Sequence, residues 1–238
     1  MSALRGVAAM LAAAVVVAGC AAGQPEIPYD RAAKAQIKKI GIVTPAFAEP
    51  SVILLNSAGS NFGLIGALAD AGMQSNRDSK LKAILQQQKY SPQDHLVENV
   101  IKGLRAAGYT VVLMQMKRDG SDFVEKYPSG DGQAVDAYLD LVAPVYGYIA
   151  NGTGDSTPYR PRVVVKARLV SAKDSSVLMQ DRVLYNPLGP DSTAVTIPAD
   201  PALQFKDFDA LAASPQTAVR GLRVATEQSA QTVAKLLQ

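Results

Sequence analysis

Arg162–Tyr185, RVVVKARLVSAKDSSVLMQDRVLY, decides the fold, because two runs of alternating side chains flank a short polar stretch. Arg162–Ser171 and Val177–Tyr185 are rich in β-branched and aliphatic residues, which favour strands. The polar residues 172–176 between them have the length of a short hairpin loop. The sequence therefore predicts an antiparallel hairpin to which the rest of a sheet is added.

Three further apolar runs predict the other main strands. They are Lys38–Thr44 (KKIGIVT), Tyr109–Met116 (YTVVLMQM) and Tyr138–Ile149, with Ser51–Leu55 (SVILL) as a short additional strand. In Tyr138–Ile149, alternation turns one set of side chains to the core and the other set away from it. The set expected in the core is Leu139, Leu141, Ala143, Val145 and Ile149, and the opposite set is Tyr138, Tyr146 and Tyr148.

Helices are predicted between these strands and after them. Residues 62–88 form the first, and polar residues crowd positions 74–78, where it could break. A second helix is expected to begin at Ser91-Pro92 and to end at Gly108. Serine is a good N-cap, proline fits the first helical position, and glycine readily ends a helix. The last helix is expected to begin at Ser214-Pro215 by the same device.

Together these elements predict one α/β (α+β) domain over residues 37–238. It has a mixed sheet of about five strands, three to four packed helices and a C-terminal helix. The strand–helix–strand order at its start predicts a parallel pair joined by a right-handed crossover. With 238 residues and 48% hydrophobic content, the chain can bury a core of this size.

The order of these elements resembles that of a known group of periplasmic proteins. Lys38–Thr44, Tyr109–Met116 and the Arg162–Tyr185 hairpin carry the likeness. It is a likeness to lipoproteins of the curli-secretion and penicillin-binding-protein-activator type, and to the N-terminal domain of the Tol-system β-propeller protein. Because it is a likeness of topology without a diagnostic motif, it implies a fold and no particular activity.

The first twenty residues, MSALRGVAAMLAAAVVVAGC, predict export across a membrane. Arg5 precedes the uncharged stretch Gly6–Gly19. As a helix this stretch would span about 21 Å, short of the ~30 Å hydrocarbon core of a bilayer. It is therefore typical of a signal peptide rather than of a membrane-spanning helix.

Val17-Ala18-Gly19-Cys20 resembles a bacterial lipobox. The resemblance implies cleavage between Gly19 and Cys20, a diacylglyceryl thioether on Cys20, and acylation of its new amino group by a fatty acid such as palmitate. Residues 1–19 are then the signal peptide, and residues 20–36 are the lipidated cysteine and a flexible tether. Three acyl chains are enough for stable membrane anchoring.

Two neighbouring features bear on this interpretation. Cys20 is the only cysteine, so it has no partner for an intramolecular disulfide. Ala21 stands where lipoproteins retained in the inner membrane commonly have aspartate. The resemblance therefore implies attachment to the periplasmic face of the outer membrane, with the inner membrane as the alternative.

Composition argues against several classes of function. The formal net charge is +3, no tryptophan is present, and aromatic residues make up 6% of the chain, which does not favour nucleic-acid binding. The single histidine, His95, has no pattern around it that predicts a catalytic triad. Asp119, Asp122 and Asp131 lie in a glycine-containing stretch without EF-hand spacing, which predicts a solvated acidic loop. No catalytic residue, metal or cofactor is therefore expected.

Two surfaces are candidates for partner binding. Arg162, Lys166, Arg168 and Arg182 are expected on one face of the hairpin, with Tyr146 and Tyr148 beside them, and Arg160 precedes them. Arginine and tyrosine are enriched at protein interfaces, and the cations also suit anionic glycans or lipid headgroups. The alternative is an ordinary solvated or helix-covered sheet face.

The second surface is a row of small residues at a spacing of four: Gly59, Gly63, Ala67 and Ala71. This spacing allows close approach of two helices, either inside the domain or between copies of the chain.

The function expected from the sequence is that of a lipid-anchored periplasmic protein that binds or assembles with another envelope component without catalysis. One alternative is a carboxylate-dependent hydrolase or lyase that acts on envelope polymers. The other is a subunit of a homo-oligomeric envelope complex.

Overall fold

The computed structural model describes residues 26–30, 32, 35–55, 63–151 and 158–238. An eight-stranded mixed sheet runs through them in the order β4-β1-β5-β6-β7-β8, and β2 and β3 also pair with β5. The strands are β1 Lys39–Val43, β2 Ala46–Phe47, β3 Ser51–Leu55, β4 Thr110–Met114, β5 Ala137–Asn151, β6 Tyr159–Ser171, β7 Val177–Tyr185 and β8 Val195–Ile197. The helices are α2 Gly63–Gln87, α3 Pro92–Ala106, α4 Phe208–Ala212 and α5 Pro215–Leu236, with a 3-10 turn, η2, at Pro201–Leu203.

The structure confirms the predicted fold class, a single mixed α/β domain with a C-terminal helix. The predicted hairpin is β6 and β7, which pair antiparallel, and the predicted parallel pair is β1 and β4. The sheet has eight strands rather than about five. Two of the additional strands, β2 and β8, are only two and three residues long, too short to show an alternating pattern.

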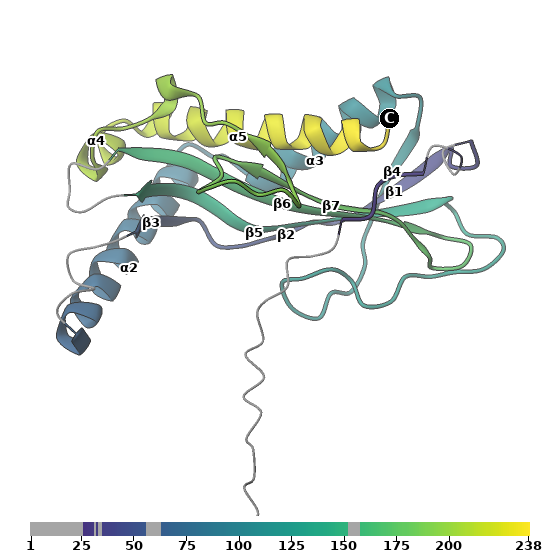
Figure 1. The fold of residues 1–238 in the computed structure, drawn as a ribbon, viewed down its shortest axis with the longest axis horizontal. Coiled ribbons are helices and arrows are strands. Elements are labelled where there is room, and N and C mark those ends of the chain that lie inside the picture. The colour runs from purple at the N-terminus through teal and green to yellow at the C-terminus, as the bar shows by residue number, and fades with distance from the viewer. Residues whose placement is uncertain (1–25, 31, 33–34, 56–62, 152–157) are drawn as a thin grey trace, which may run out of the picture.

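The two faces of the sheet differ in what covers them. Helices α3 and α5 lie across one face, as Figure 1 shows, and α5 runs along β6 and β7. On β6 the residues that face these helices, Val163, Val165, Ala167 and Leu169, are completely buried. The long connection from β4 to β5, residues 115–136, lies on the opposite side of the sheet.

Helix α3 begins and ends as predicted. The side chain of Ser91 accepts a hydrogen bond from the backbone N–H of Asp94 (3.2 Å), and Pro92 is the first helical residue. Gly108, which follows the helix, has a φ of +92°, a conformation that glycine adopts without strain. The buried residues Leu96, Val100 and Leu104 form the stripe that packs on the core.

The break considered at positions 74–78 of the first helix is not present. Helix α2 is continuous, and Asp78 accepts hydrogen bonds both from Gln74 Nε2 (2.8 Å) and from the backbone N–H of Val52 in β3 (2.7 Å). The polar residues therefore join the helix to the sheet. Within the described ranges, no helix combines the length and the apolar composition needed to cross a bilayer.

Part of the segment predicted as a flexible tether, residues 20–36, lies against the domain. Residues 1–25, which include the predicted signal peptide and Cys20, lie outside the described residues. Residues 26–30 belong to the domain, because Ile27 forms an antiparallel bridge with Gln180 on the outer edge of β7. A docked segment thus replaces part of the tether predicted over residues 20–36.

Close packing of α5 on the sheet predicts a contrast between two helical glycines. A Cβ on Gly221 would overlap the hydroxyl of Tyr148, which donates a hydrogen bond to the Ala218 carbonyl (2.8 Å). Gly72 in α2 is exposed and has open space around it. We expect Gly221→Ala to lower the free energy of unfolding by about 1–3 kcal/mol. Gly72→Ala should leave it unchanged or raise it by up to about 1 kcal/mol. Urea unfolding of both variants measures this, and equal effects would contradict the packing described.

Candidate binding face

A row of cations lies on the face of the sheet that α3 and α5 leave free. Arg160, Arg162, Lys166 and Arg168 alternate along β6 with residues that face the helices, and Arg182 of β7 pairs with Lys166. We call these five residues the cationic face. The sequence predicted that four of them share one side of the hairpin, which the structure confirms, and Arg160 extends the row.

Tyr146 and Tyr148 are not part of this face, so their assignment to a partner surface was wrong. Both are 1% exposed and lie in the core beneath the helices. The cause is a bulge in β5, where the pairing with β6 shifts between Val142 and Val145. Pro144 lies within this shift, and proline, which cannot donate to the ladder, is typical of bulges. The one extra residue reverses the alternation, so side chains after Pro144 face opposite to the predicted direction.

Two cations of the face have carboxylate partners. Lys166 Nζ lies 2.8 Å from Asp122 Oδ1, and this hydrogen bond lowers the pKa of the Asp122 carboxyl. Arg182 Nη2 lies 3.3 Å from Asp191 Oδ2 and donates to Thr193 Oγ1 (2.6 Å). These charges are therefore balanced within the domain.

Arg168 is held by a neutral group and an aromatic ring. Its Nε donates to Gln180 Oε1 (2.7 Å), and its guanidinium carbon lies 4.1 Å from the centroid of the Phe123 ring. A cation at this distance from a ring face is attracted by the π system. Phe123 thereby covers this end of the cationic face.

Among the described residues, Arg160 and Arg162 have neither the carboxylate partner of Lys166 and Arg182 nor the aromatic partner of Arg168. Arg160 Nε donates to Gln204 Oε1 (3.2 Å), and Arg162 Nη1 donates to the Asn186 carbonyl (2.5 Å). In the part of the chain that the structure describes, both arginines have only neutral oxygen partners. Burial lowers the pKa of Arg162, since desolvation disfavours its charged form.

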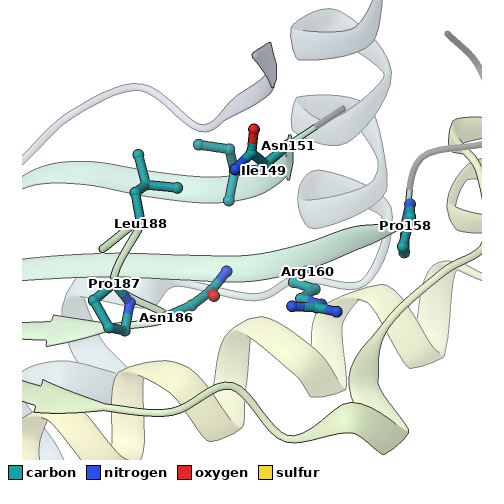
Figure 2. A pocket seen from close by; sticks show the side chains of 7 residues that line it. All are labelled: Ile149, Asn151, Pro158, Arg160, Asn186, Pro187 and Leu188. Atoms are coloured by element: carbon teal, nitrogen blue, oxygen red, sulfur yellow. The ribbon is translucent and has the colours of Figure 1, made fainter. Parts of the chain in front are cut away.

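A pocket of about 240 Å³ is lined in part by Arg160 and by Asn186, whose carbonyl accepts the hydrogen bond from Arg162. Figure 2 shows its lining, which comes from the end of β5, the start of β6 and the residues after β7. The lining residues are Ile149, Asn151, Pro158, Arg160, Asn186, Pro187 and Leu188. Apolar side chains thus stand beside one exposed guanidinium, a combination that accepts an anionic group attached to a less polar body.

A buried ion pair fixes the connection 115–136 to the other end of the face. Asp140 is completely buried and lies 2.7 Å from Arg118 Nη2. It also accepts hydrogen bonds from the backbone N–H of Val124 (2.8 Å) and the hydroxyl of Tyr127 (2.7 Å). This pair was not predicted from the sequence, although a lone carboxylate in the apolar run AYLDLVAPV indicates a buried, paired charge.

The other residues considered as catalytic or metal-binding candidates do not form a catalytic or metal site within the described residues. His95 contacts the ring of Tyr90 edge-on at 5.7 Å, and burial, followed by the charge of Arg223, lowers its pKa. Asp119, Asp122 and Asp131 are all exposed, as predicted for a solvated loop, and Asp122 pairs with Lys166. Among the residues that the structure describes, no group of three or more His, Cys, Asp or Glu side chains is placed to hold a metal.

The small-residue row is described only in part. Gly19, Cys20 and Gly59 lie outside the described residues. Gly63, Ala67 and Ala71 lie in α2, and Ala71 is exposed. The role of this row of small residues in self-association stays a prediction.

Comparisons with known proteins add a likeness of fold and no family. No protein-family model and no curated protein sequence matches the chain. Protein XCC0632 of Xanthomonas campestris, from family DUF330, aligns with 89% of this chain and 85% of its own at 11% identity and a TM-score of 0.38. A PelC dodecamer from Paraburkholderia phytofirmans aligns with 90% and 96% of the two chains at 11% identity and a TM-score of 0.34. A homologue of a neuraminyllactose-binding hemagglutinin from Helicobacter pylori covers 90% and 87% at 8% identity and a TM-score of 0.28.

These identities and TM-scores are too low to bear on what this chain binds or does. The fold and the face define a class only, that of a single-domain α/β protein with one helix-covered and one cationic side of its sheet. The predicted likeness to lipoproteins of the curli-secretion type stays a prediction.

The buried pair predicts a large effect of one charge removal. Asp140→Asn leaves Arg118, whose side chain is 11% exposed, without its counter-ion. We expect the free energy of unfolding to fall by about 3 kcal/mol or more. Glu49→Gln breaks the exposed pair with Lys82 (2.8 Å) and should cost less than about 1 kcal/mol. Urea unfolding of the two variants decides this, and similar losses would contradict the role of Asp140.

The environment of His95 predicts a pH dependence of stability. Because its pKa is lowered in the folded state, the unfolded chain binds the proton first as the pH falls below about 6.5. The free energy of unfolding should therefore decrease between about pH 7.5 and about pH 5.5 by more in the wild type than in His95→Gln. Denaturant unfolding at both pH values measures the difference. An equal change in the free energy of unfolding with pH in the two proteins would show that His95 makes no contribution.

Proposed function

We propose that this protein is a lipid-anchored protein of the bacterial envelope that binds an anionic envelope component through its cationic face and does not act as an enzyme. The lipobox-like Val17-Ala18-Gly19-Cys20 supports the anchor, and the absence of an aspartate at Ala21 supports the periplasmic face of the outer membrane. The partner is a protein, glycan or lipid of the envelope that carries negative charge.

One observation carries the binding proposal. Arg160 and Arg162 stand two residues apart on one side of β6 and have only neutral partners among the described residues. Arg160 lines the pocket of Figure 2, and Arg162 donates a hydrogen bond to the carbonyl of Asn186, another lining residue. Arginine presents a planar fork of donors that fits carboxylate and phosphate groups. An incoming anion would meet positive charge that no carboxylate among the described residues balances.

The surroundings of the two arginines favour binding over simple solvation. Arg162 is partly desolvated, and charge-assisted hydrogen bonds are stronger where water is excluded. Ile149, Pro187 and Leu188 add apolar area to the same pocket, and Leu188 is 47% exposed. An anionic ligand with an apolar or sugar body therefore has both kinds of contact available.

The carboxylate-dependent enzyme has less support in the same structure. Asp140, the most buried carboxylate described, accepts hydrogen bonds from Arg118, Val124 and Tyr127. Its side chain is completely buried and its oxygens are occupied by these donors, so it is not presented to a polymer substrate.

The test is crosslinking and capture of partners from intact cells. Arg160→Gln/Arg162→Gln should reduce the yield of the crosslinked partner about tenfold, since a tenfold loss corresponds to about 1.4 kcal/mol. Lys102→Gln/Arg220→Gln removes two exposed cations from the helix-covered side and serves as the matched control, with unchanged capture expected.

A third variant, Cys20→Ala, tests the anchor in the same experiment. We expect it to leave the membrane fraction and to lose envelope partners. If wild type and Cys20→Ala fractionate alike and capture the same proteins, the anchor is wrong. If the Arg160→Gln/Arg162→Gln variant and the Lys102→Gln/Arg220→Gln control capture the partner equally, the binding face is wrong. Turnover of a cell-wall or lipid substrate that a point mutation abolishes would overturn the non-enzymatic proposal.

A further inference from the structure

The segment Glu26–Asp30 is built into the edge of the sheet. The N–H of Ile27 donates to the Gln180 carbonyl (2.7 Å), and the N–H of Gln180 donates to the Ile27 carbonyl (2.8 Å). Exposure alternates along the segment, with Glu26, Pro28 and Asp30 exposed and Ile27 and Tyr29 half-buried. This is the pattern of an edge strand, and Pro28, which has no N–H, stands at an outward position.

Tyr29 adds a side-chain anchor to the bridge. It packs against the main core, and its hydroxyl lies 3.5 Å from that of Tyr109. Tyr109 in turn donates to the Leu237 carbonyl at the end of α5 (2.7 Å). The segment is therefore attached both to β7 and to the C-terminal end of α5.

The docked segment covers an edge that would otherwise be open. Strand β8 pairs with Val183–Tyr185 only, so the first half of the outer edge of β7 is left to Ile27. Unpaired strand edges are sites of unwanted association, and proteins commonly cover them. Docking of the segment therefore protects the edge of β7 whether or not the protein is on a membrane.

Docking also changes how far the domain can stand from a lipid on Cys20. From Cys20 to Ile27 the chain has seven residue steps, which span at most about 25 Å when fully extended. If the segment were free, the chain from Cys20 to Ile37, where the body of the domain begins, would span up to about 60 Å. A domain of this size is roughly 45 Å across, so the docked reach is shorter than the domain itself.

We propose that Glu26–Asp30 is a latch that holds the end of the domain formed by the start of β7 and the end of α5 against the bilayer, within about 25 Å of the lipid anchor. The partner of this end is a lipid surface. The membrane-facing orientation rests on the acylation of Cys20 proposed above, whereas the docking of the latch on β7 does not depend on acylation.

The two ends of β6 provide probes for this orientation. Lys173, in the hairpin after β6, is exposed at the latched end. Asp209 is exposed at the other end, because its neighbour Phe208 packs on Tyr159 at the start of β6 (6.0 Å between ring centroids). The length of β6 separates these ends by about 40 Å.

The first measurement tests docking alone. Ile27→Cys/Gln180→Cys places two thiols on a hydrogen-bonded antiparallel pair, whose Cα separation of about 5.5 Å suits a disulfide. Ile27→Cys/Val177→Cys is the matched control, since position 177 lies about 10 Å further along β7. We expect the first pair, and not the second, to form a reductant-sensitive crosslink in the full chain. The result should be the same with Cys20 intact or replaced by alanine.

The second measurement tests orientation. The full-length chain, purified from membranes, is labelled at Lys173→Cys or Asp209→Cys and reconstituted into phosphatidylethanolamine–phosphatidylglycerol vesicles that carry an acceptor dye on the headgroup. Acylated Cys20 does not react, so each chain carries one label. We expect several-fold stronger energy transfer from position 173 than from position 209. Ile27→Pro, which removes the N–H donated to Gln180, should abolish the difference, and Pro28→Ala should keep it.

Each outcome has a distinct meaning. A crosslink with stronger transfer from position 173 supports the latch and its orientation. Absence of the crosslink, or a crosslink equally frequent in the control pair, overturns the latch. A specific crosslink with equal transfer from both positions overturns the membrane-facing orientation. If the wild-type chain has a free Cys20 thiol and stays off the vesicles, the proposed anchor fails and the orientation fails with it, while the crosslink still reports the latch.

Discussion

Antiparallel pairing between β5 and β6 holds the structure together, because every other strand of the sheet is attached to one of these two strands directly or through one neighbouring strand. Strands β1, β2 and β3 follow one another along the free edge of β5, and β4 is added beyond β1. Strands β7 and β8 extend the sheet from β6. Loss of register between β5 and β6 would move side chains between the two faces along the whole sheet.

The same pairing separates the chemistry of the two faces. The side that faces α3 and α5 is aliphatic and aromatic on both strands, and it forms the main core. The other side carries the five residues of the cationic face, and the connection 115–136, fixed by Asp140 and Arg118, covers one end of it. Only at the end around Arg160 and Arg162 do the described residues supply neither a carboxylate nor an aromatic ring to the cations, which is why we place binding there.

Prediction from the sequence succeeded where a strand or helix carries its own pattern. The bounds of β7 and of β3 are those predicted, and the start of α3 follows from Ser91 and Pro92. Alternation along β6 also predicted which cations share a face. In each case the signal is local and repeats within a few residues.

Prediction failed where the outcome depends on a distant partner. The bulge at Pro144 reversed the faces of Tyr146 and Tyr148, and counting by twos along the strand does not include such a shift. The docking of Ile27 on Gln180 joins residues 153 positions apart. The proline-containing segment around Ile27 has no periodicity that predicts a strand. The pair of Arg118 with Asp140 likewise requires knowledge of how the connection 115–136 folds back.

The proposed partners depend on the proposed membrane anchor, because the cationic face can bind only molecules that lie within reach of it. The most direct measurement is intact-protein and N-terminal peptide mass spectrometry of the chain purified from bacterial membranes. The account predicts an N-terminus at Cys20 that carries a diacylglyceryl thioether and an N-linked acyl chain, with residues 1–19 removed. An N-terminus at any other residue, with an unmodified thiol at Cys20, would contradict it.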